Sequence, residues 1–416
     1  MKLVVIFAKI VVLVQNVHKK INYYMPNFIT RFKNNRVYLE ILGSSDDENE
    51  YYVKFIDLNS NESVYENTLK INHWCEFPSD SDKNILIKVT SNEDVVFERR
   101  QDYKFNKIYI KFGSKALGDN IAWIPYVEEY RKINNVEVIL YTFHNYLFDK
   151  AYPNIIFTDV SDSNLINDVD KKFRIDYGPE LYRVNGVSIP EGWHIENRKY
   201  DNFVEYFDYR KISLQTIAPT ILGLEINEIK PEINIPEDNG PKIKGKYAVV
   251  AMQSTFQSKY WNNPFGWERI VDFLGRNGYK VVLLDKFRKF GVPGYFNQAP
   301  KSKYIIDKTG NFPLSERITD IKYADMMITL SSGLAWLAWS VGTPVIMISG
   351  FTKPWNEFQS NCIRIHNSSV CNGCWNDPEI TYDAASWMFC PKKQDFICSK
   401  AIQPKDVTDA VKTLMK

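Results

Sequence analysis

The stretch "MMITLSSGLAWLAWSVGTPVIMISG", residues 326–350, decides the fold of this chain. It begins with a short apolar run at 326–330, continues after two serines with a helix-like segment at 333–341, and ends in a second apolar run at 344–350. Short apolar runs bounded by turn residues indicate buried strands, and a helix between two of them indicates parallel pairing. The stretch therefore predicts a parallel sheet covered by helices.

The same alternation surrounds this stretch. Apolar strands are expected at 247–253 and 279–285, and helices at 266–277 and 314–324. We therefore predict a second α/β domain, Rossmann-like, over residues 247–416.

An earlier α/β pattern precedes it. A strand at 107–112 is followed by a short loop and a helix at 119–133, with further strands at 136–143 and 154–160 and a helix at 213–224. These elements predict a first Rossmann-like domain over residues 105–225. Residues 226–246 are rich in proline and charge and lack periodicity, so they are expected to form a linker between the two domains. Two such domains create a cleft, and open α/β sheets bind ligands beyond the carboxyl ends of their strands.

The N-terminal part has a different sequence pattern. Between residues 36 and 100, short apolar strands alternate with polar runs at the spacing of hairpins. We predict a small antiparallel β domain within residues 1–104. The fold expected for the whole chain is thus α/β, with two Rossmann-like domains facing a cleft and a β-rich N-terminal domain.

Composition excludes several classes of protein. The 416 residues have a formal charge of +2, with 25% charged and 44% hydrophobic residues, so neither disorder nor nucleic-acid binding is indicated. The apolar start is interrupted by Lys9 and is shorter than the roughly 20 residues that span a bilayer. No signal-peptide cleavage site is recognisable. Residues 1–24 are either an N-terminal strand or helix, or lie upstream of a functional start at Met25.

A candidate general base lies in the loop after the first strand of the first α/β domain. In "SKALGDNIAWIP", residues 114–125, Gly118 lets the backbone approach a ligand and Asp119 opens a helix. Aspartate is a favoured helix N-cap, so capping explains its position as well as catalysis does. A general base needs a carboxylate in the cleft within reach of the acceptor hydroxyl, and this location would also supply one.

A candidate anion site lies in the second α/β domain. The loop 252–264 contains Ser254, Thr255 and Lys259 just before a helix, and hydroxyls, backbone N–H groups and a lysine are suited to a phosphate. The alternative is a solvated loop, and the spacing is not that of a Walker motif.

The fold-deciding stretch adds a second set of donors. Ser331, Ser332 and Gly333 precede a helix, so their backbone N–H groups are expected to point into the same cleft. Trp336 and Trp339 within that helix are expected to pack in the core.

Four cysteines close to the C-terminus form the sharpest local pattern. Cys371, Cys374, Cys390 and Cys398 lie within residues 368–400, with two, fifteen and seven residues between successive members. Four thiolates suit a tetrahedral zinc or iron ion and leave no position for substrate. A redox pair and unrelated buried thiols are the alternatives. In the cytoplasm, where thiols stay reduced, metal binding is favoured over disulfides.

Together these motifs resemble the bacterial autotransporter O-heptosyltransferases, relatives of the lipopolysaccharide heptosyltransferases with the GT-B fold. The resemblance covers most of the chain and rests on "LGDNIAWIPYVEE" at 117–129, "KYWN" at 259–262, "SSGLAWLAW" at 331–339 and the cysteine cluster. It implies a cytoplasmic enzyme that transfers heptose from ADP-heptose to serine hydroxyls of an autotransporter adhesin. It also implies one iron ion in the four-cysteine site, with zinc as the alternative, and a homo-oligomer without stable membrane insertion.

The resemblance also assigns roles to residues. Asp119 matches the catalytic base, with Ala116, Leu117 and Gly118 forming its loop, and Lys259 matches the lysine at the donor phosphates. The nucleotide-side turn corresponds to Ser331, Ser332 and Gly333.

Two places depart from the pattern of the lipopolysaccharide enzymes, which usually carry an aspartate and a histidine where this chain has Ser331 and Trp336. Asp285, at the end of a strand, is expected to reach the ribose.

Three other functions remain as alternatives to transfer of heptose from ADP-heptose to an adhesin. The first is a GT-B transferase with another nucleotide sugar or a glycan or lipid acceptor. The others are a rubredoxin-like redox protein and a non-catalytic scaffold.

Overall fold

The computed structural model describes residues 26–33, 36–43, 46–78, 84–101, 107–159, 169, 171–177, 208–237, 240–380 and 386–415. The expectations about residues 1–24 and Met25 lie outside these ranges. None of the helices within them combines the length and the apolar character that crossing a membrane requires.

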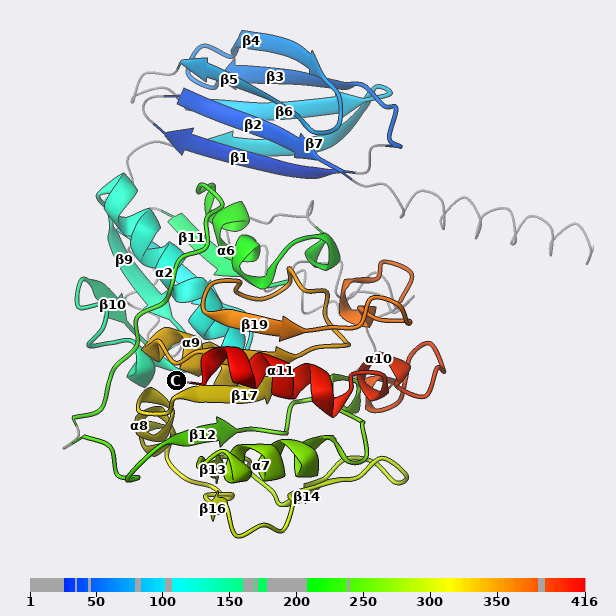
Figure 1. Ribbon diagram of the computed structural model, residues 1–416. Helices are drawn as coiled ribbons and strands as arrows, with labels where there is room; N and C mark the ends of the chain where they lie inside the picture. Colours follow the sequence, from blue (N-terminus) through cyan, green and yellow to red (C-terminus); the bar gives the residue numbers. More distant parts are fainter. Residues whose placement is uncertain are drawn as a thin grey trace, which may run out of the picture.

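Two antiparallel sheets form the N-terminal part, drawn in blue at the top of Figure 1. The first sheet contains β1 (Asn27–Lys33), β2 (Arg36–Leu42) and β5 (His73–Pro78), in the order β1-β2-β5. The second contains β3 (Tyr51–Asp57), β4 (Glu62–Leu69), β6 (Ile85–Ser91) and β7 (Asp94–Gln101), in the order β4-β3-β6-β7. Apolar side chains that alternate along β2, β3 and β6 pack together into one core. The predicted antiparallel β structure is therefore confirmed.

Strands were expected at 36–42, 51–58, 84–90 and 94–100, and β2, β3, β6 and β7 lie within one residue of these ends. The strands β1, β4 and β5 were not predicted from the sequence. β4 is an edge strand whose side chains are mostly exposed, so it carries no apolar alternation to detect.

A parallel sheet of four strands follows. It contains β8 (Lys107–Phe112), β9 (Glu137–Tyr141), β10 (Ile155–Phe157) and β11 (Lys171–Ile175), in the order β10-β9-β8-β11. Two helices, α2 (Leu117–Asn134) and α6 (Leu214–Leu222), belong to this part and pack against each other.

A parallel sheet of six strands forms the C-terminal part. Its order is β16 (Ile305–Asp307), β13 (Lys280–Leu283), β12 (Tyr247–Val250), β17 (Met326–Leu330), β18 (Val345–Ile348) and β19 (Cys362–Ile365). Four helices accompany the sheet, namely α7 (Gly266–Arg276), α8 (Leu314–Lys322), α9 (Gly333–Val341) and α11 (Pro404–Leu414). Alternate strand residues face the two sides: Val250 and Ile328 join the core under α7 and α11, whereas Val249 and Met327 join the core with α8 and α9.

The short elements lie in connections. They are the strands β14 (Lys289–Phe290) and β15 (Asn297–Gln298), the helix α10 (Ile397–Lys400), and the 3₁₀ helices η1 (Asn145–Leu147), η2 (Tyr209–Lys211), η3 (Gln257–Lys259), η4 (Cys374–Asn376) and η5 (Ser386–Met388).

One arginine joins the N-terminal sheets to the first parallel-sheet unit. From β7, Arg99 donates through Nη1 to the carbonyl of Thr220 at 3.2 Å and through Nη2 to that of Ile221 at 2.8 Å. These carbonyls lie in the last turn of α6, where no helical N–H is left to pair them. The guanidinium therefore pairs the carbonyls at the C-terminal end of α6 and attaches the N-terminal β sheets to this helix.

The two parallel sheets share one continuous core. α2 packs against α9, and apolar residues of both sheets contribute to the cluster between them. Figure 1 shows α2 and α9 beside each other in this middle layer. The α/β architecture expected from the sequence is confirmed, and it brings the carboxyl ends of β8, β12 and β17 to the same region.

Candidate active site

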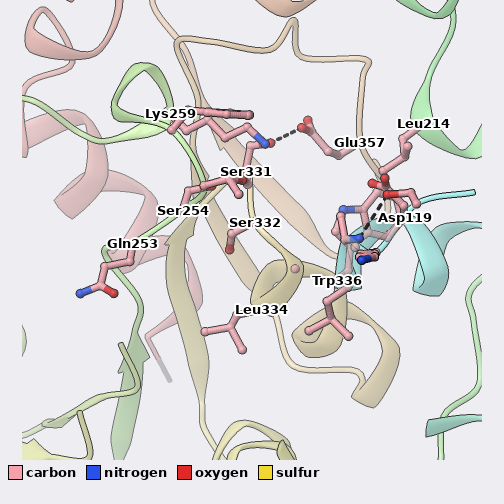
Figure 2. A pocket seen from close by; sticks show the side chains of 18 of the residues that line it. Asp119, Leu214, Gln253, Ser254, Lys259, Ser331, Ser332, Leu334, Trp336 and Glu357 are labelled. Atoms are coloured by element: carbon pink, nitrogen blue, oxygen red, sulfur yellow. Dashed lines mark hydrogen bonds between the residues drawn. The ribbon is translucent and has the colours of Figure 1, made fainter. Parts of the chain in front are cut away.

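A cavity of about 800 Å³ opens where the strands of the two sheets end. Its walls include the loops after β8, β11, β12, β13, β16 and β18, the start of α9, and Trp375. All eleven residues that the sequence analysis placed at the catalytic and donor sites line it: Ala116, Leu117, Gly118, Asp119, Ser254, Thr255, Lys259, Asp285, Ser331, Ser332 and Gly333. Figure 2 shows ten of its lining residues by name.

Asp119 is the carboxylate contributed by the first parallel-sheet unit. It occupies the third position of α2, whose N-cap is Ala116, so Asp119 is not the N-cap. Its side chain is only 6% exposed. Burial raises the pKa of this carboxyl group, while hydrogen bonds from Ser114 and Tyr177 and the charge of Lys259 act in the opposite direction. A buried carboxylate with a raised pKa is suited to accept a proton.

Asn120 holds the loop that presents Asp119. The buried Asn120 amide donates to the carbonyls of Ser114 and Ala116, each at 2.8 Å, and its oxygen accepts from the N–H of Phe143 at 3.2 Å. The loop between β8 and α2 is thus tied to the segment after β9. This fixes the backbone on both sides of Leu117 and sets the direction in which Asp119 points.

Lys259 is the cation contributed by the six-stranded unit. It ends η3, and its ammonium group lies 5.8 Å from the centre of the Phe256 ring. Burial lowers the pKa of Lys259, and the charges of Glu357 and Asp119 counteract this effect. In the part of the chain that the structure describes, no carboxylate lies within ion-pair distance of its ammonium group. Its positive charge is therefore available to an anionic ligand.

The N-terminus of α9 supplies further donors beside Lys259. Ser332 is the N-cap of α9 but its side chain makes no capping hydrogen bond. The first N–H groups of the helix are therefore not paired by a cap and point their positive dipole into the cavity. Ser254 donates to the carbonyl of Ser331 at 3.0 Å, which joins the loop after β12 to this helix start.

Asp285 lines the same cavity but its carboxylate is engaged by backbone. Oδ1 and Oδ2 accept from the N–H of Met252 at 2.9 and 2.8 Å, and Oδ1 accepts from that of Gln253 at 2.9 Å. Burial raises the pKa of Asp285 to about 7, against the effect of these two N–H groups and of Arg317. These contacts fix the end of β12, and a ribose contact by Asp285 stays a prediction.

Glu357 is a site residue that the sequence analysis missed. It follows β18 in an irregular loop, is 4% exposed, and pairs with Arg364 at 2.7 Å. Its carboxylate also accepts a hydrogen bond from the hydroxyl of Ser331, drawn as a dashed line in Figure 2. The only available signal was a charged residue after the apolar strand at 344–350, and such residues are common on surfaces.

The expected core role of two tryptophans is confirmed. Trp336 and Trp339 are 2% and 1% exposed, and both contact the ring of Phe358. Trp336 also forms part of the cavity wall beside Gly118.

The four cysteines lie in one neighbourhood outside the cavity. All four are free thiols, and Cys374 and Cys398 are buried. Burial raises the pKa of Cys374 to about 12, and the thiols of Cys398, Cys371 and Cys390 add to this rise. Cys390 accepts a hydrogen bond from the N–H of Gln394 at 3.3 Å, a contact that stabilises a thiolate.

The four cysteines were expected to bind a metal ion. The chemistry of four clustered thiols with an N–H donor to sulfur fits a tetrahedral ion. Within the described ranges, however, no set of three or more His, Cys, Asp or Glu side chains is arranged to hold one. By its chemistry the set of four thiols fits a zinc or iron ion.

The cysteine segment nevertheless contacts the cavity. Trp375, next to Cys374, lines the cavity and its ring lies 5.5 Å from that of Tyr177. On the other side, the hydroxyl of Ser258 donates to the carbonyl of Trp387 at 2.7 Å. The segment thus supports both the wall near Asp119 and the turn that carries Lys259.

The arrangement defines a class of enzyme. One unit offers a buried carboxylate, and the other offers a lysine and a helix N-terminus, which are the groups that transferases with a phosphate-activated donor require. Comparison with known proteins agrees, because residues 216–377 match the family model of glycosyltransferase family 9 (heptosyltransferase).

Curated relatives narrow the class. The autotransporter heptosyltransferase Aah of Escherichia coli is 31% identical over 319 residues, covering 75% of each chain. The inactive autotransporter heptosyltransferase BimC of Burkholderia thailandensis is 26% identical over 346 residues, covering 79% of this chain and 74% of its own. The crystal structure of TibC, an iron-containing dodecameric glycosyltransferase of enterotoxigenic E. coli, aligns at a TM-score of 0.66 with 26% identity, covering 93% of this chain and 95% of its own. The chain belongs to the autotransporter heptosyltransferases.

Proposed function

We propose that this protein transfers a heptose from ADP-heptose to serine hydroxyls of an autotransporter adhesin. The observation that carries the proposal is the meeting of Asp119 and Lys259, from two different α/β units, in one cavity. TibC, which this chain resembles along most of its length, has been crystallised in complex with ADP-D-β-D-heptose. The relative arrangement of the two units around a cleft supports a GT-B assignment.

The chain's own groups account for the transfer. Asp119 accepts the proton of the acceptor hydroxyl as its oxygen attacks the anomeric carbon of the sugar. Lys259 and the N–H groups at the start of α9, which no side chain caps, bind the diphosphate and stabilise the negative charge that it gains on departure. Attack on the face opposite the leaving group inverts the anomeric configuration.

The four-cysteine segment is proposed to bind one metal ion, iron by analogy with TibC, or zinc. Cys371, Cys374, Cys390 and Cys398 would hold it, and it would order a segment that has little apolar periodicity. Reduced thiols in such a site fit a reducing compartment, so we place the reaction in the cytoplasm. A homo-oligomer is proposed on the same analogy.

The experiment that tests the function is intact-mass analysis of a candidate adhesin. The adhesin is incubated with the purified protein and ADP-heptose, and in parallel with the Asp119→Asn variant. The proposal expects mass increments of whole heptose units with the wild type and none with the variant. Because BimC is described as inactive, an absence of increments across several adhesins, with ADP-heptose bound, would assign this chain to a non-catalytic role.

A further inference from the structure

Glu357 is a buried acidic side chain of the cavity wall that the mechanism above does not use. We infer that Glu357 is a positioning residue that turns the hydroxyl of Ser331 into a hydrogen-bond acceptor for a hydroxyl of the transferred sugar. The inference rests on the proposed function and specifies which part of the donor this pair of residues reads.

Every acceptor position of Glu357 is occupied by protein. Oε1 accepts from the hydroxyl of Ser331 and from Asn356 Nδ2 at 3.2 Å. Oε2 accepts from Arg364 Nη1 at 2.7 Å and from Thr352 Oγ1 at 3.3 Å. A carboxylate offers about four lone-pair sites, so no site is left for a ligand. Glu357 can therefore influence a ligand only through one of the residues that it contacts.

Ser331 is that neighbour, because it lines the cavity and its proton is already committed. A hydroxyl has one proton to donate and two lone pairs that accept. Since the proton of Ser331 is directed at Glu357, only lone pairs remain for the cavity. Lone pairs repel phosphate oxygens and attract O–H groups. Ser331 is thus complementary to a sugar hydroxyl and not to the diphosphate.

The position of the pair agrees with this chemistry. In Figure 2, the hydroxyl of Ser331 contacts Glu357, and the side chains of Lys259, Glu357 and Asp119 all line the same cavity. The same two carboxylates, Glu357 and Asp119, are those whose charges act on Lys259. The sugar connects the diphosphate at Lys259 to the acceptor oxygen at Asp119, so its ring occupies the space that Ser331 borders.

Arg364 makes Glu357 difficult to replace. Its Nη1 pairs with Glu357, while Nε and Nη2 are buried and have no hydrogen-bond partner in the described part of the chain. A neutral residue at 357 would leave this guanidinium without a counter-charge, which is strongly destabilising. The test therefore needs a variant that spares the ion pair, and Ser331→Ala does so.

The experiment compares two ligands on the full-length protein by isothermal titration calorimetry. ADP contains the nucleotide and the diphosphate, and ADP-heptose adds the sugar. Ser331→Ala is expected to weaken ADP-heptose binding by about 3- to 10-fold, the worth of one neutral hydrogen bond, and to leave ADP binding unchanged. Glu357→Gln is expected to do the same if it folds, because its amide donates to Ser331 and turns that proton into the cavity.

Ser254→Ala is the matched control. Its hydroxyl contacts the backbone carbonyl of Ser331, so its removal should change ADP and ADP-heptose affinity by the same factor. Equal losses for both ligands in Ser331→Ala, or no loss for either, would overturn the inference. A wild-type protein that does not bind ADP-heptose would instead overturn the proposed function, which keeps the two failures apart.

Discussion

Gly118 at the start of α2 lies directly against Trp336 of α9, so that a Cβ atom at position 118 would be only 2.8 Å from Trp336 Cδ1. The contact is reciprocal, because a Cβ at Gly333 would lie 2.9 Å from Leu117 Cβ and 3.2 Å from the backbone nitrogen of Gly118. The two glycines allow two helix N-termini from different α/β units to meet. This approach places Asp119 and the donor N–H groups of α9 on the same cavity.

Gly118→Ala should therefore separate the two helices. We expect a loss of about 1–3 kcal/mol in the free energy of unfolding, the usual cost of overpacking, measured by urea denaturation. Catalytic rate should fall as well, because the base moves away from the donor site. In a double-mutant cycle with Trp336→Phe, the smaller ring should relieve part of the cost, giving an interaction energy of about 0.5 kcal/mol or more. Simple additivity would show that the contact does not set the spacing.

The parts of the structure that were predicted are those that leave a local pattern in the sequence. The strands at 107–112 and 326–330 coincide with β8 and β17 because buried parallel strands are rich in apolar residues. The residues predicted to serve in catalysis and donor binding follow strand ends or precede helices, and such positions can be recognised from the local sequence pattern. For this reason the whole predicted set lines one cavity.

The site residues that were not predicted from the sequence owe their positions to tertiary structure. Glu357 and Arg364 form a buried pair, but each alone has the sequence signature of a surface charge. Trp375 has no sequence signature beyond its position next to Cys374, and its place in the cavity wall arises from packing against Tyr177. The local sequence pattern does not show which residue a side chain will contact. It also does not show whether an isolated charged residue will be buried.

Asp119→Asn should abolish transfer while leaving ADP binding intact. The amide fills the same space but cannot accept the proton, and loss of a general base usually costs about 10²- to 10⁴-fold in rate. In the wild type, burial raises the pKa of Asp119, and the base works only when ionised. The rate should therefore fall on acidification at a pH above the ordinary aspartate value of 3.8. A variant with wild-type turnover would remove Asp119 from the catalytic step.

Lys259→Met should weaken ADP binding and slow transfer together, because one charge serves the bound diphosphate and the leaving group. A loss of about 1.5–3 kcal/mol in ADP affinity is expected for a charged hydrogen bond, measured by calorimetry. Since burial lowers the pKa of Lys259, wild-type ADP affinity should also decline with rising pH before the ordinary lysine value of 10.5 is reached. Lys412→Met, on the exposed face of α11, is the control and should change neither property. Equal affinity in Lys259→Met and wild type would contradict the assignment.

Cys374→Ser should lower the metal content of the purified protein, because four thiolates are needed to saturate a tetrahedral ion. Elemental analysis of a metal-replete preparation is the measurement, and Cys362→Ser is the control, since Cys362 lies in β19 outside the cysteine segment. Loss of the ion should also reduce ADP affinity, as the segment anchors Ser258 beside Lys259 through the carbonyl of Trp387. Structural metal sites ordinarily bind tightly, so folded and active wild-type protein with less than about 0.2 metal per chain would refute the metal site. Equal metal content in Cys374→Ser and Cys362→Ser would place the ion elsewhere in the chain.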